Sequence, residues 1–300
     1  MKESLHKKDD KIEVYKMPLS PTNLYSNFCI LINGKYEYFY KRAVDPNAQK
    51  YFEDEIQITI KLSDINISPE VCYFDLEKKV IMSKYIKSDL DKLSPQKLEY
   101  IINKLKQFHS MNLLTKDSFY NLKKKLWLDR FEKLPQKVKE DFKHVAGVIA
   151  NQSDFYDKAD IVWSHNDLHK SNILVSGNSA FLIDFDQSGA NSKYFDLATL
   201  SLSLELSEYQ EHTLLNMYSN CYNYEKFTKQ KVIVAAQYAL SVITLINDMD
   251  LVTVNKHNSS IPFLWEGEFS SNIDNDRFNL AYNFLNYFNL LIKKENVLRI

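Results

Sequence analysis

The sequence predicts an α+β fold with a small N-terminal lobe built on an antiparallel sheet and a larger, mainly helical C-terminal lobe. The first observation is a pair of hairpin signals before residue 86. The second is a helical periodicity of apolar residues that begins after Ser94. The third is a set of short apolar strands at 161–183 whose ends carry acids and amides. We therefore divide the chain into lobes at 1–86 and 87–300.

The small lobe is predicted to open with a hairpin over residues 24–31 and 36–41. Its turn, Asn33-Gly34, is the residue pair that tight hairpin turns prefer, because both residues tolerate positive φ. The second strand ends in Lys41 and Arg42. A register shift of one residue would exchange the faces on which these two side chains lie.

A helix and a second hairpin are expected after this first hairpin. Residues 51–62 carry apolar positions at helical spacing, with Ile56 and Ile60 on one face. Strand-forming runs at 71–76 and 80–82 then predict the second hairpin, around a charged turn.

The larger lobe is expected to be built from helices. Ser94 and Pro95 begin the first one, because serine caps free backbone N–H groups and proline suits the first helical turn. His109, near the end of that helix, has no evident partner in the sequence and is interpreted as a helix-end or packing residue, with a catalytic role as the less favoured alternative. Further helical segments, with a break near Pro135 in the first, are expected over 116–160, 197–206, 232–246 and 277–293.

The composition excludes several classes of protein. A net charge of −1 on 300 residues gives no overall basic field for nucleic acid. The basic run Lys123-Lys124-Lys125 is interpreted as a solvated helix face, which is favoured over the alternative of a phosphate-binding run. Three scattered cysteines argue against a disulfide framework and for a reducing compartment.

No segment of the sequence has the character of a membrane span. The longest apolar run, 232–246, is interrupted by polar residues and is shorter than the roughly twenty residues that cross a bilayer. The polar stretch 1–16 lacks the apolar segment of a signal peptide. We therefore expect a soluble, cytoplasmic protein, whose oligomeric state the sequence does not determine.

The central segment 161–200 concentrates the chemistry-bearing residues. Phosphoryl transfer from ATP needs a carboxylate beside the attacking hydroxyl and oxygen ligands that hold Mg²⁺ against the phosphates. Asp167 is placed for the first task, and Asn172 and Asp184 for the second. A lone Asp and Asn at this spacing also occurs by chance, with the Asp as a turn or cap residue. The combination of these residues with three strands and with the acids Asp184 and Asp186 favours a functional site over a chance match.

Three motifs in this segment resemble the aminoglycoside phosphotransferase and choline kinase superfamily, which has a two-lobed protein-kinase-like fold. They are His165-Asn166-Asp167-Leu168, Leu182-Ile183-Asp184-Phe185-Asp186 and Phe195-Asp196-Leu197-Ala198. The first has the form usual in choline and ethanolamine kinases. The match is specific over 161–200 and diffuse over the rest of the chain.

The resemblance implies a role for each polar residue of these motifs. Asp167 would be the catalytic base, and Asn172 and Asp184 would bind Mg²⁺. Asp186 would contact a second ion or the substrate. Two further residues would support the loop backbone without taking part in the chemistry, His165 and Asp196.

The resemblance also implies which residues of the small lobe hold the phosphates of ATP. Lys41 would contact the α- and β-phosphates, with Arg42 as the alternative. Glu55 would pair with this lysine and align it, and Glu53 and Asp54 are alternatives for that role.

The remaining nucleotide contacts are implied to be made largely by the backbone. Adenine would bond to backbone groups between the lobes, around Ser83 and Tyr85. The turn that covers the phosphates would contain Thr22 and Asn23. The glycine pair usual there in the family is absent, which would limit how closely backbone amides approach phosphate.

The substrate residues are the least specified. By resemblance, Glu205 would face a cationic head group, although a solvent-facing position is an equal alternative. Tyr238 and Trp265 would offer aromatic faces to the cation. The helix 232–246 lacks the second large aromatic residue that choline kinases present, so this cage is incomplete on the helix.

The sequence therefore predicts an ATP- and Mg²⁺-dependent phosphotransferase that acts on the hydroxyl of a small, cationic metabolite. Choline or ethanolamine is the first candidate acceptor and thiamine the next. An aminoglycoside-type antibiotic kinase is an alternative, and a pseudokinase that acts as a binding module is another. A protein kinase is less favoured, because the stretch between Asp184 and Asp196 leaves little room for an activation segment.

Overall fold

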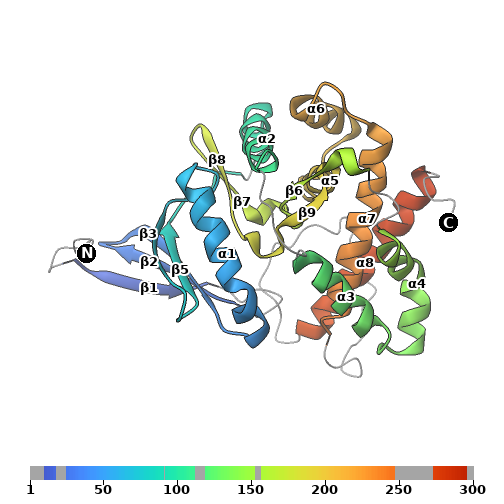
Figure 1. The fold of residues 1–300 in the computed structure, drawn as a ribbon, viewed down its shortest axis with the longest axis horizontal. Coiled ribbons are helices and arrows are strands. Elements are labelled where there is room, and N and C mark those ends of the chain that lie inside the picture. The colour runs from blue at the N-terminus through green and yellow to red at the C-terminus, as the bar shows by residue number, and fades with distance from the viewer. Residues whose placement is uncertain are drawn as a thin grey trace.

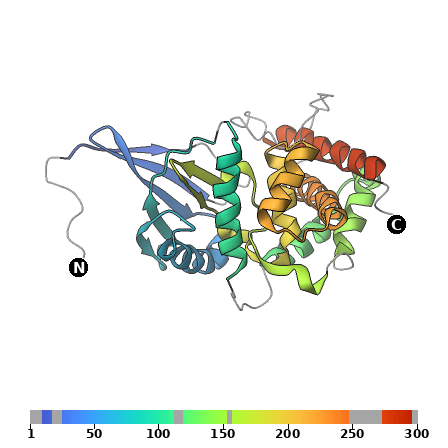
Figure 2. The ribbon, with the colours of Figure 1, turned by 90° about the horizontal axis from the view of Figure 1, so that it is seen from above.

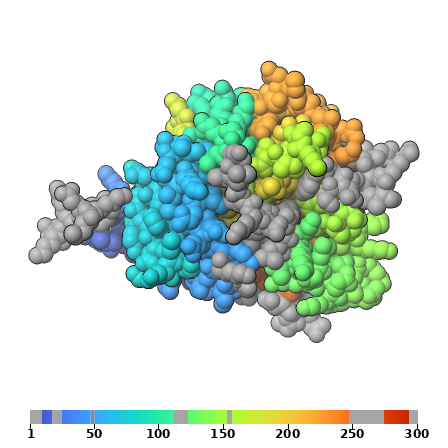
Figure 3. Space-filling view, in the orientation of Figure 1, coloured from blue at the N-terminus to red at the C-terminus, as the bar shows by residue number. Residues whose placement is uncertain are grey.

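Strands gather in the N-terminal part of the chain and helices in the C-terminal part, and they form two lobes (Figure 1). The computed structural model describes residues 10–17, 25–90, 92–111, 119–152, 157–246 and 273–295. In the space-filling view the blue and cyan small lobe lies directly against the larger lobe (Figure 3). The predicted α+β class is confirmed.

The small lobe is a five-stranded antiparallel sheet in the order β1-β2-β3-β5-β4. Its strands are β1 (Ile12–Lys16), β2 (Tyr25–Ile32), β3 (Lys35–Ala43), β4 (Val71–Asp75) and β5 (Val80–Lys84). The turn between β2 and β3 has positive φ at Asn33 (51°) and Gly34 (77°), as its sequence predicts. The register buries Lys41 and exposes Arg42, so Lys41 is the cation on the inner face.

Strand β1 is an addition that the sequence analysis missed. The N-terminal stretch was interpreted as a polar leader, but residues 12–16 pair with β2 along its outer edge. Ile12 and Val14 alternate with polar residues, a pattern typical of a strand with one apolar face. At an edge, backbone pairing stabilises such a strand without deep burial of its side chains.

Helix α1 (Pro46–Asp64) covers the inner face of this sheet. Phe52 and Ile56, both buried, pack with Tyr25, Ala43 and Ile81 in a small separate core. The predicted helix therefore exists and is longer at both ends. Helix α1 also contacts the short turn at Phe185–Gln187 of the larger lobe, which brings the two lobes together beside the central motif.

The larger lobe combines two strand pairs with helices (Figure 2). Strand β6 (Ile161–Ser164) pairs with β9 (Gly189–Ser192), and β7 (Ile173–Ser176) pairs with β8 (Ser179–Leu182). The sequence analysis missed β9 because it is short and contains glycine and asparagine. The helices are α2 (Pro95–His109), α3 (Phe119–Phe131), α4 (Gln136–Ala150), α5 (Lys193–Ser203), α6 (Glu208–Tyr218), α7 (Tyr224–Ile243) and α8 (Ile273–Glu295).

Helix α7 is the centre of this helical lobe, where it packs against α4, α5 and α8. Most of its residues after Phe227 are buried, which explains why it is apolar nearly all round. Helix α2 begins as predicted, with the Ser94 side chain accepting a hydrogen bond from Lys97 N. Within the described residues, each helix is too short or too polar to cross a membrane.

We predict that Phe108→Ala strongly destabilises the larger lobe. Phe108 is fully buried on α2, and its ring lies 5.6 Å from that of Phe185. Removing a buried aromatic ring lowers the free energy of unfolding by about 3–5 kcal/mol, which urea denaturation measures. Leu126→Ala, at an exposed site of α3, is the control and should change it by less than about 0.5 kcal/mol. Equal effects of both substitutions would contradict the assigned core.

Candidate active site

The loop between β6 and β7 carries the predicted catalytic residues and is held by its own polar side chains. Asn166 has positive φ (64°), a conformation that asparagine tolerates better than most residues. Its amide Nδ2 donates to the backbone oxygen of Gln187 (2.9 Å), and its Oδ1 accepts from Nδ2 of Asn191 (2.7 Å). The unusual backbone turn is therefore fixed by β9 and the segment before it.

Asp196 is the buried anchor of this loop. Its carboxylate accepts hydrogen bonds from the backbone N–H groups of His165 (2.7 Å) and Asn166 (2.9 Å). Its Oδ2 also lies 2.9 Å from Nε2 of His109. Burial disfavours the charge, but the hydrogen bond and charge of His109 and the loop contacts outweigh it and lower the pKa of Asp196.

His109 and His165 each connect this anchor to a further element. His109 is buried at the end of α2, as predicted, but it has polar partners that the sequence did not reveal, Asp196 on one ring nitrogen and the Tyr218 hydroxyl (2.8 Å) on the other. His165 places Nε2 2.9 Å from the backbone oxygen of Ile183, just before the second acidic segment. The loop that carries Asp167 is thereby joined to the segment that carries Asp184 and Asp186.

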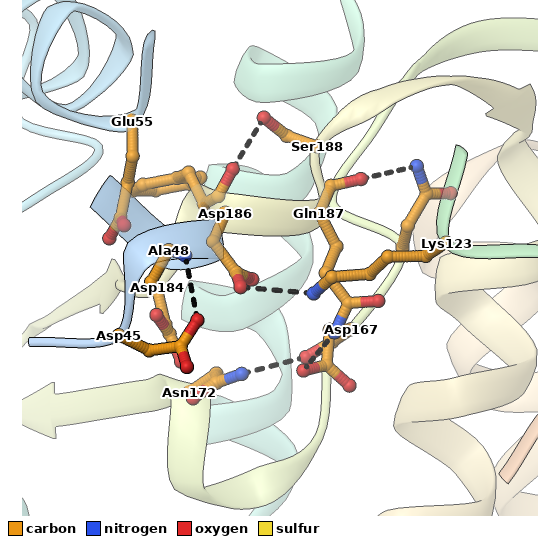
Figure 4. Close-up of polar contacts among 12 residues, drawn as sticks. Asp45, Ala48, Glu55, Lys123, Asp167, Asn172, Asp184, Asp186, Gln187 and Ser188 are labelled. Atoms are coloured by element: carbon orange, nitrogen blue, oxygen red, sulfur yellow. Dashed lines mark hydrogen bonds and ion pairs between the residues drawn. The ribbon is translucent and has the colours of Figure 1, made fainter. Parts of the chain in front are cut away.

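The Asp167 carboxylate has a donor on each oxygen, one of which, from Gln187, is drawn in Figure 4. Gln187 Nε2 donates to Oδ2 (3.0 Å), and the Tyr238 hydroxyl donates to Oδ1 (2.6 Å). Asn172 Nδ2 donates to the backbone oxygen of Asp167 (2.9 Å). The side chain of Asp167 is 15% exposed, so a small hydroxyl compound can reach it.

Lys41 joins the small lobe to the second acidic segment. Its Nζ lies 2.6 Å from Glu55 Oε1 and 2.5 Å from Asp184 Oδ1. Burial disfavours the ammonium charge, but the two carboxylates outweigh it and raise the pKa of Lys41. Burial also disfavours the charge of Glu55, which for an acid means a higher pKa. The pKa of Glu55 is raised to about 7, although Lys41 favours its charged form.

The alternatives to Glu55 have other surroundings. Glu53 lies 3.4 Å from Lys79 at the surface, and Asp54 is exposed. Glu55 is therefore the acid of α1 that reaches Lys41.

The second acidic segment turns sharply at Asp184, which has positive φ (66°). Burial works against its charge, but Lys41 keeps the pKa of Asp184 below its usual value. Asp186, two residues on, lies 3.1 Å from the Lys123 ammonium of α3. Burial is the largest influence on Asp186 and raises its pKa, although Lys123 favours the charged form.

The residues present fit a Mg²⁺ ion in their donor chemistry. Asn172 uses its Nδ2 on the loop backbone, which leaves its amide oxygen as a potential ligand, and Asp184 supplies a partly exposed carboxylate. In the described part of the chain, no group of three or more His, Cys, Asp and Glu side chains is arranged to hold a metal. Mg²⁺ in kinases is held by one or two protein side chains plus phosphate and water, so this sparse donor set suits it.

Other predicted residues are less close to this centre. Glu205 lies beyond the end of α5, with positive φ (54°) and an exposed side chain, so the predicted helix to residue 206 is wrong and the solvent-facing alternative describes it. Ser83 lies within β5, paired with Phe39. Tyr85 N donates to the backbone oxygen of Glu37 (2.9 Å), so this N–H group is bonded within the small lobe. Outside the described residues lie Thr22, Asn23 and Trp265.

Tyr238 has a place that the sequence analysis did not foresee. Its ring stacks on that of Phe284 (5.3 Å between centroids), and its hydroxyl contacts Asp167. Gln187 and Lys123 were also missed as neighbours of the site. Gln187 follows the acidic motif directly, so its position was a usable signal, whereas Lys123 has no signal in the sequence.

The phosphotransferase enzyme family matches residues 34–227, more than half of the chain. The protein belongs to this family. The match includes Lys41, Glu55, Asp167 and Asp184, and it makes the protein a phosphotransferase.

Individual proteins that are similar to this chain support the assignment to the family. Protein LicA of Haemophilus influenzae is 25% identical over 215 residues, which cover 63% of this chain and 67% of that protein. Choline kinase LicA from Streptococcus pneumoniae has a TM-score of 0.65 at 18% identity, covering 92% of this chain and 93% of that one. The streptomycin–ATP–APH(2")-IIa ternary complex has a TM-score of 0.58 at 17% identity, covering 81% and 88%. These likenesses confirm the two-lobed kinase-like fold of this phosphotransferase.

We predict that Asp196→Asn destabilises the protein in a pH-dependent way. An amide keeps one acceptor oxygen but turns its NH₂ toward a buried donor, so the free energy of unfolding should fall by about 3–5 kcal/mol near neutral pH. Because the pKa of Asp196 is depressed in the folded state, its stabilising effect is present above the unfolded pKa. It is lost as the pH falls through the folded value.

The measurement is a series of denaturation curves for both proteins from pH 8 downward. The difference between them should be constant above about pH 5 and shrink below about pH 4, the ordinary range for Asp. Asp129→Asn, at an exposed position of α3, is the control. A difference that stays constant down to pH 2 would contradict the assigned charge.

Proposed function

We propose that this phosphotransferase uses ATP and Mg²⁺ to phosphorylate the hydroxyl of a small cationic metabolite. The observation that supports the proposal most is the meeting of three segments at one point. Asp167 and Asn172 come from the loop after β6, Asp184 comes from the turn after β8, and Lys41 reaches Asp184 from the small lobe. These are the groups that phosphoryl transfer requires.

The protein residues would act on the acceptor and the nucleotide in one step. The acceptor hydroxyl passes its proton to the Asp167 carboxylate while its oxygen forms a bond to the γ-phosphorus of ATP. The bond from that phosphorus to the bridging oxygen breaks, and ADP leaves with the electron pair. Gln187 and Tyr238 orient the carboxylate, and Lys41 offsets phosphate charge.

Asn172 and Asp184 are the proposed holders of Mg²⁺. The bound ion would supply positive charge against the phosphate oxygens. Lys41 contacts only Oδ1 of Asp184, so the other carboxylate oxygen can serve as a ligand while the ion pair is kept.

Choline or ethanolamine is the first acceptor that we propose, and thiamine the next. The name of the Streptococcus pneumoniae relative, a choline kinase, supports this order. The acids around Asp167 also favour a substrate with positive charge. An aminoglycoside remains the second candidate, supported by the fold likeness to the streptomycin complex.

A panel of acceptors decides between these candidates. Choline, ethanolamine, thiamine and streptomycin are each supplied with ATP and Mg²⁺, and ADP release is measured. We expect the highest kcat/KM with one of the two amino alcohols. Turnover of streptomycin alone would make the protein an antibiotic kinase.

We predict that Asp167→Asn lowers kcat by roughly 10²–10⁴-fold, the usual contribution of a general base. The amide is isosteric but cannot accept the proton. ATP binding, followed by thermal shift, should remain because Asp167 does not contact the nucleotide in this mechanism. Asp129→Asn serves again as the matched control. Full turnover by the Asp167 variant would rule out this assignment of the base.

A pseudokinase is distinguished by nucleotide binding. We predict that ATP with Mg²⁺ at about 100 times its Kd stabilises the wild-type protein by about 2.7 kcal/mol, as mass action requires. A thermal-shift titration measures this. A binding module that has lost its nucleotide would show no shift at any ATP concentration.

A further inference from the structure

Lys123 lies in α3 yet reaches the acidic segment that follows β8 (Figure 4). Its Nζ is 3.1 Å from Asp186 Oδ2, and the two side chains are only 15% and 9% exposed. The interpretation of the run Lys123-Lys124-Lys125 as a solvated face is therefore wrong for its first member. Lys125 is exposed, as that interpretation requires.

The position of Lys123 complements that of Lys41. Lys41 comes from the small lobe and contacts Asp184, whereas Lys123 comes from the larger lobe and contacts Asp186. Asp186 also lies within the electrostatic influence of both Asp184 and Asp167. Lys123 therefore brings positive charge to Asp186, an acid that is influenced by the charge of the proposed catalytic base.

Packing alone does not explain a lysine at this place. Burying two charges carries a desolvation penalty, and an apolar side chain of similar size often gives equal or greater stability. Helix α3 already contacts the turn at Phe185–Gln187 and packs against α4 and α7. The packing of α3 therefore does not by itself require the charge of Lys123, which lies against the acidic segment of the site.

We propose that Lys123 is a second phosphate-binding lysine, which contacts the γ-phosphoryl group as it passes from ATP to the acceptor. This inference rests on the proposed function. The phosphoryl group carries negative charge on its three peripheral oxygens while its bond to ADP breaks and its bond to the acceptor forms. Lys123 gives up no proton in this step, and the acceptor proton goes to Asp167.

Lysine suits this role because its ammonium is a compact charge with three donors on a flexible stem. It can hold Asp186 and a phosphoryl oxygen together. Asp186 would then keep the ammonium in place before the nucleotide binds.

The test compares Lys123→Gln with Lys125→Gln. Glutamine at position 123 can still donate a hydrogen bond to Asp186 but carries no charge. The probes are ADP and the non-hydrolysable analogue β,γ-imido-ATP, each with Mg²⁺, and binding is measured by titration calorimetry. We expect Lys123→Gln to bind ADP with unchanged Kd but to bind the analogue about tenfold more weakly. With the acceptor that the panel identifies, its kcat should fall roughly 10²-fold, as when one transition-state donor is removed.

Lys123→Arg, which keeps the charge, should restore most of the affinity for the analogue, and Lys125→Gln should match the wild type throughout. Equal weakening of ADP and analogue binding, or unchanged binding of both, would show that Lys123 only ties α3 to the acidic segment, and would overturn the proposal. Failure of the proposed function has a different signature, since the wild type and Lys125→Gln would then also bind neither nucleotide.

Discussion

The buried carboxylate of Asp196 is the interaction on which the site depends. It collects two backbone N–H groups of the loop that carries Asp167, and a histidine from α2. An ionised carboxylate is stable without water only when it has such donors. Asp196 lies in the first turn of α5. Its hydrogen bonds therefore fix the loop relative to the helical lobe. The position of Asp167 is thus set by the core of the larger lobe.

Charge balance is the second constraint, and it acts between the lobes. Four acids, Glu55, Asp167, Asp184 and Asp186, gather around the junction, and two lysines partly neutralise them. Lys41, from the small lobe, contacts Asp184, and Lys123, from the larger lobe, contacts Asp186. Lys41 also pairs with Glu55, so it bridges an acid of the small lobe and an acid of the larger lobe. The raised pKa of Asp186 reflects burial, and the lowered pKa of Asp184 reflects Lys41.

The sequence was sufficient for the elements with strong local signals. The Asn33-Gly34 turn, the Ser94 cap and the buried helix α7 were all predicted, because each depends on residues close in the chain. The sequence left two candidates for the cation that contacts the phosphates, Lys41 and Arg42. Only the strand register of the structure distinguished them. Lys123 and His109 were not predicted as parts of the site. Their partners lie 63 and 87 positions away, and no local pattern encodes such contacts.

The connection between the lobes limits how they can move. Tyr85 is the last residue bonded to the small sheet, through Glu37, and Ser88 is the first bonded to the larger lobe, through its hydroxyl and Val175 N (3.2 Å). Two residues, 86 and 87, lie between these fixed points. The backbone oxygen of Ile67, in the small lobe, also accepts a hydrogen bond from Leu182 N (2.8 Å), and Leu62 and Ile67 are buried in the core of the larger lobe. A rotation of the sheet about residues 86 and 87 would therefore have to break the bond between Ile67 and Leu182.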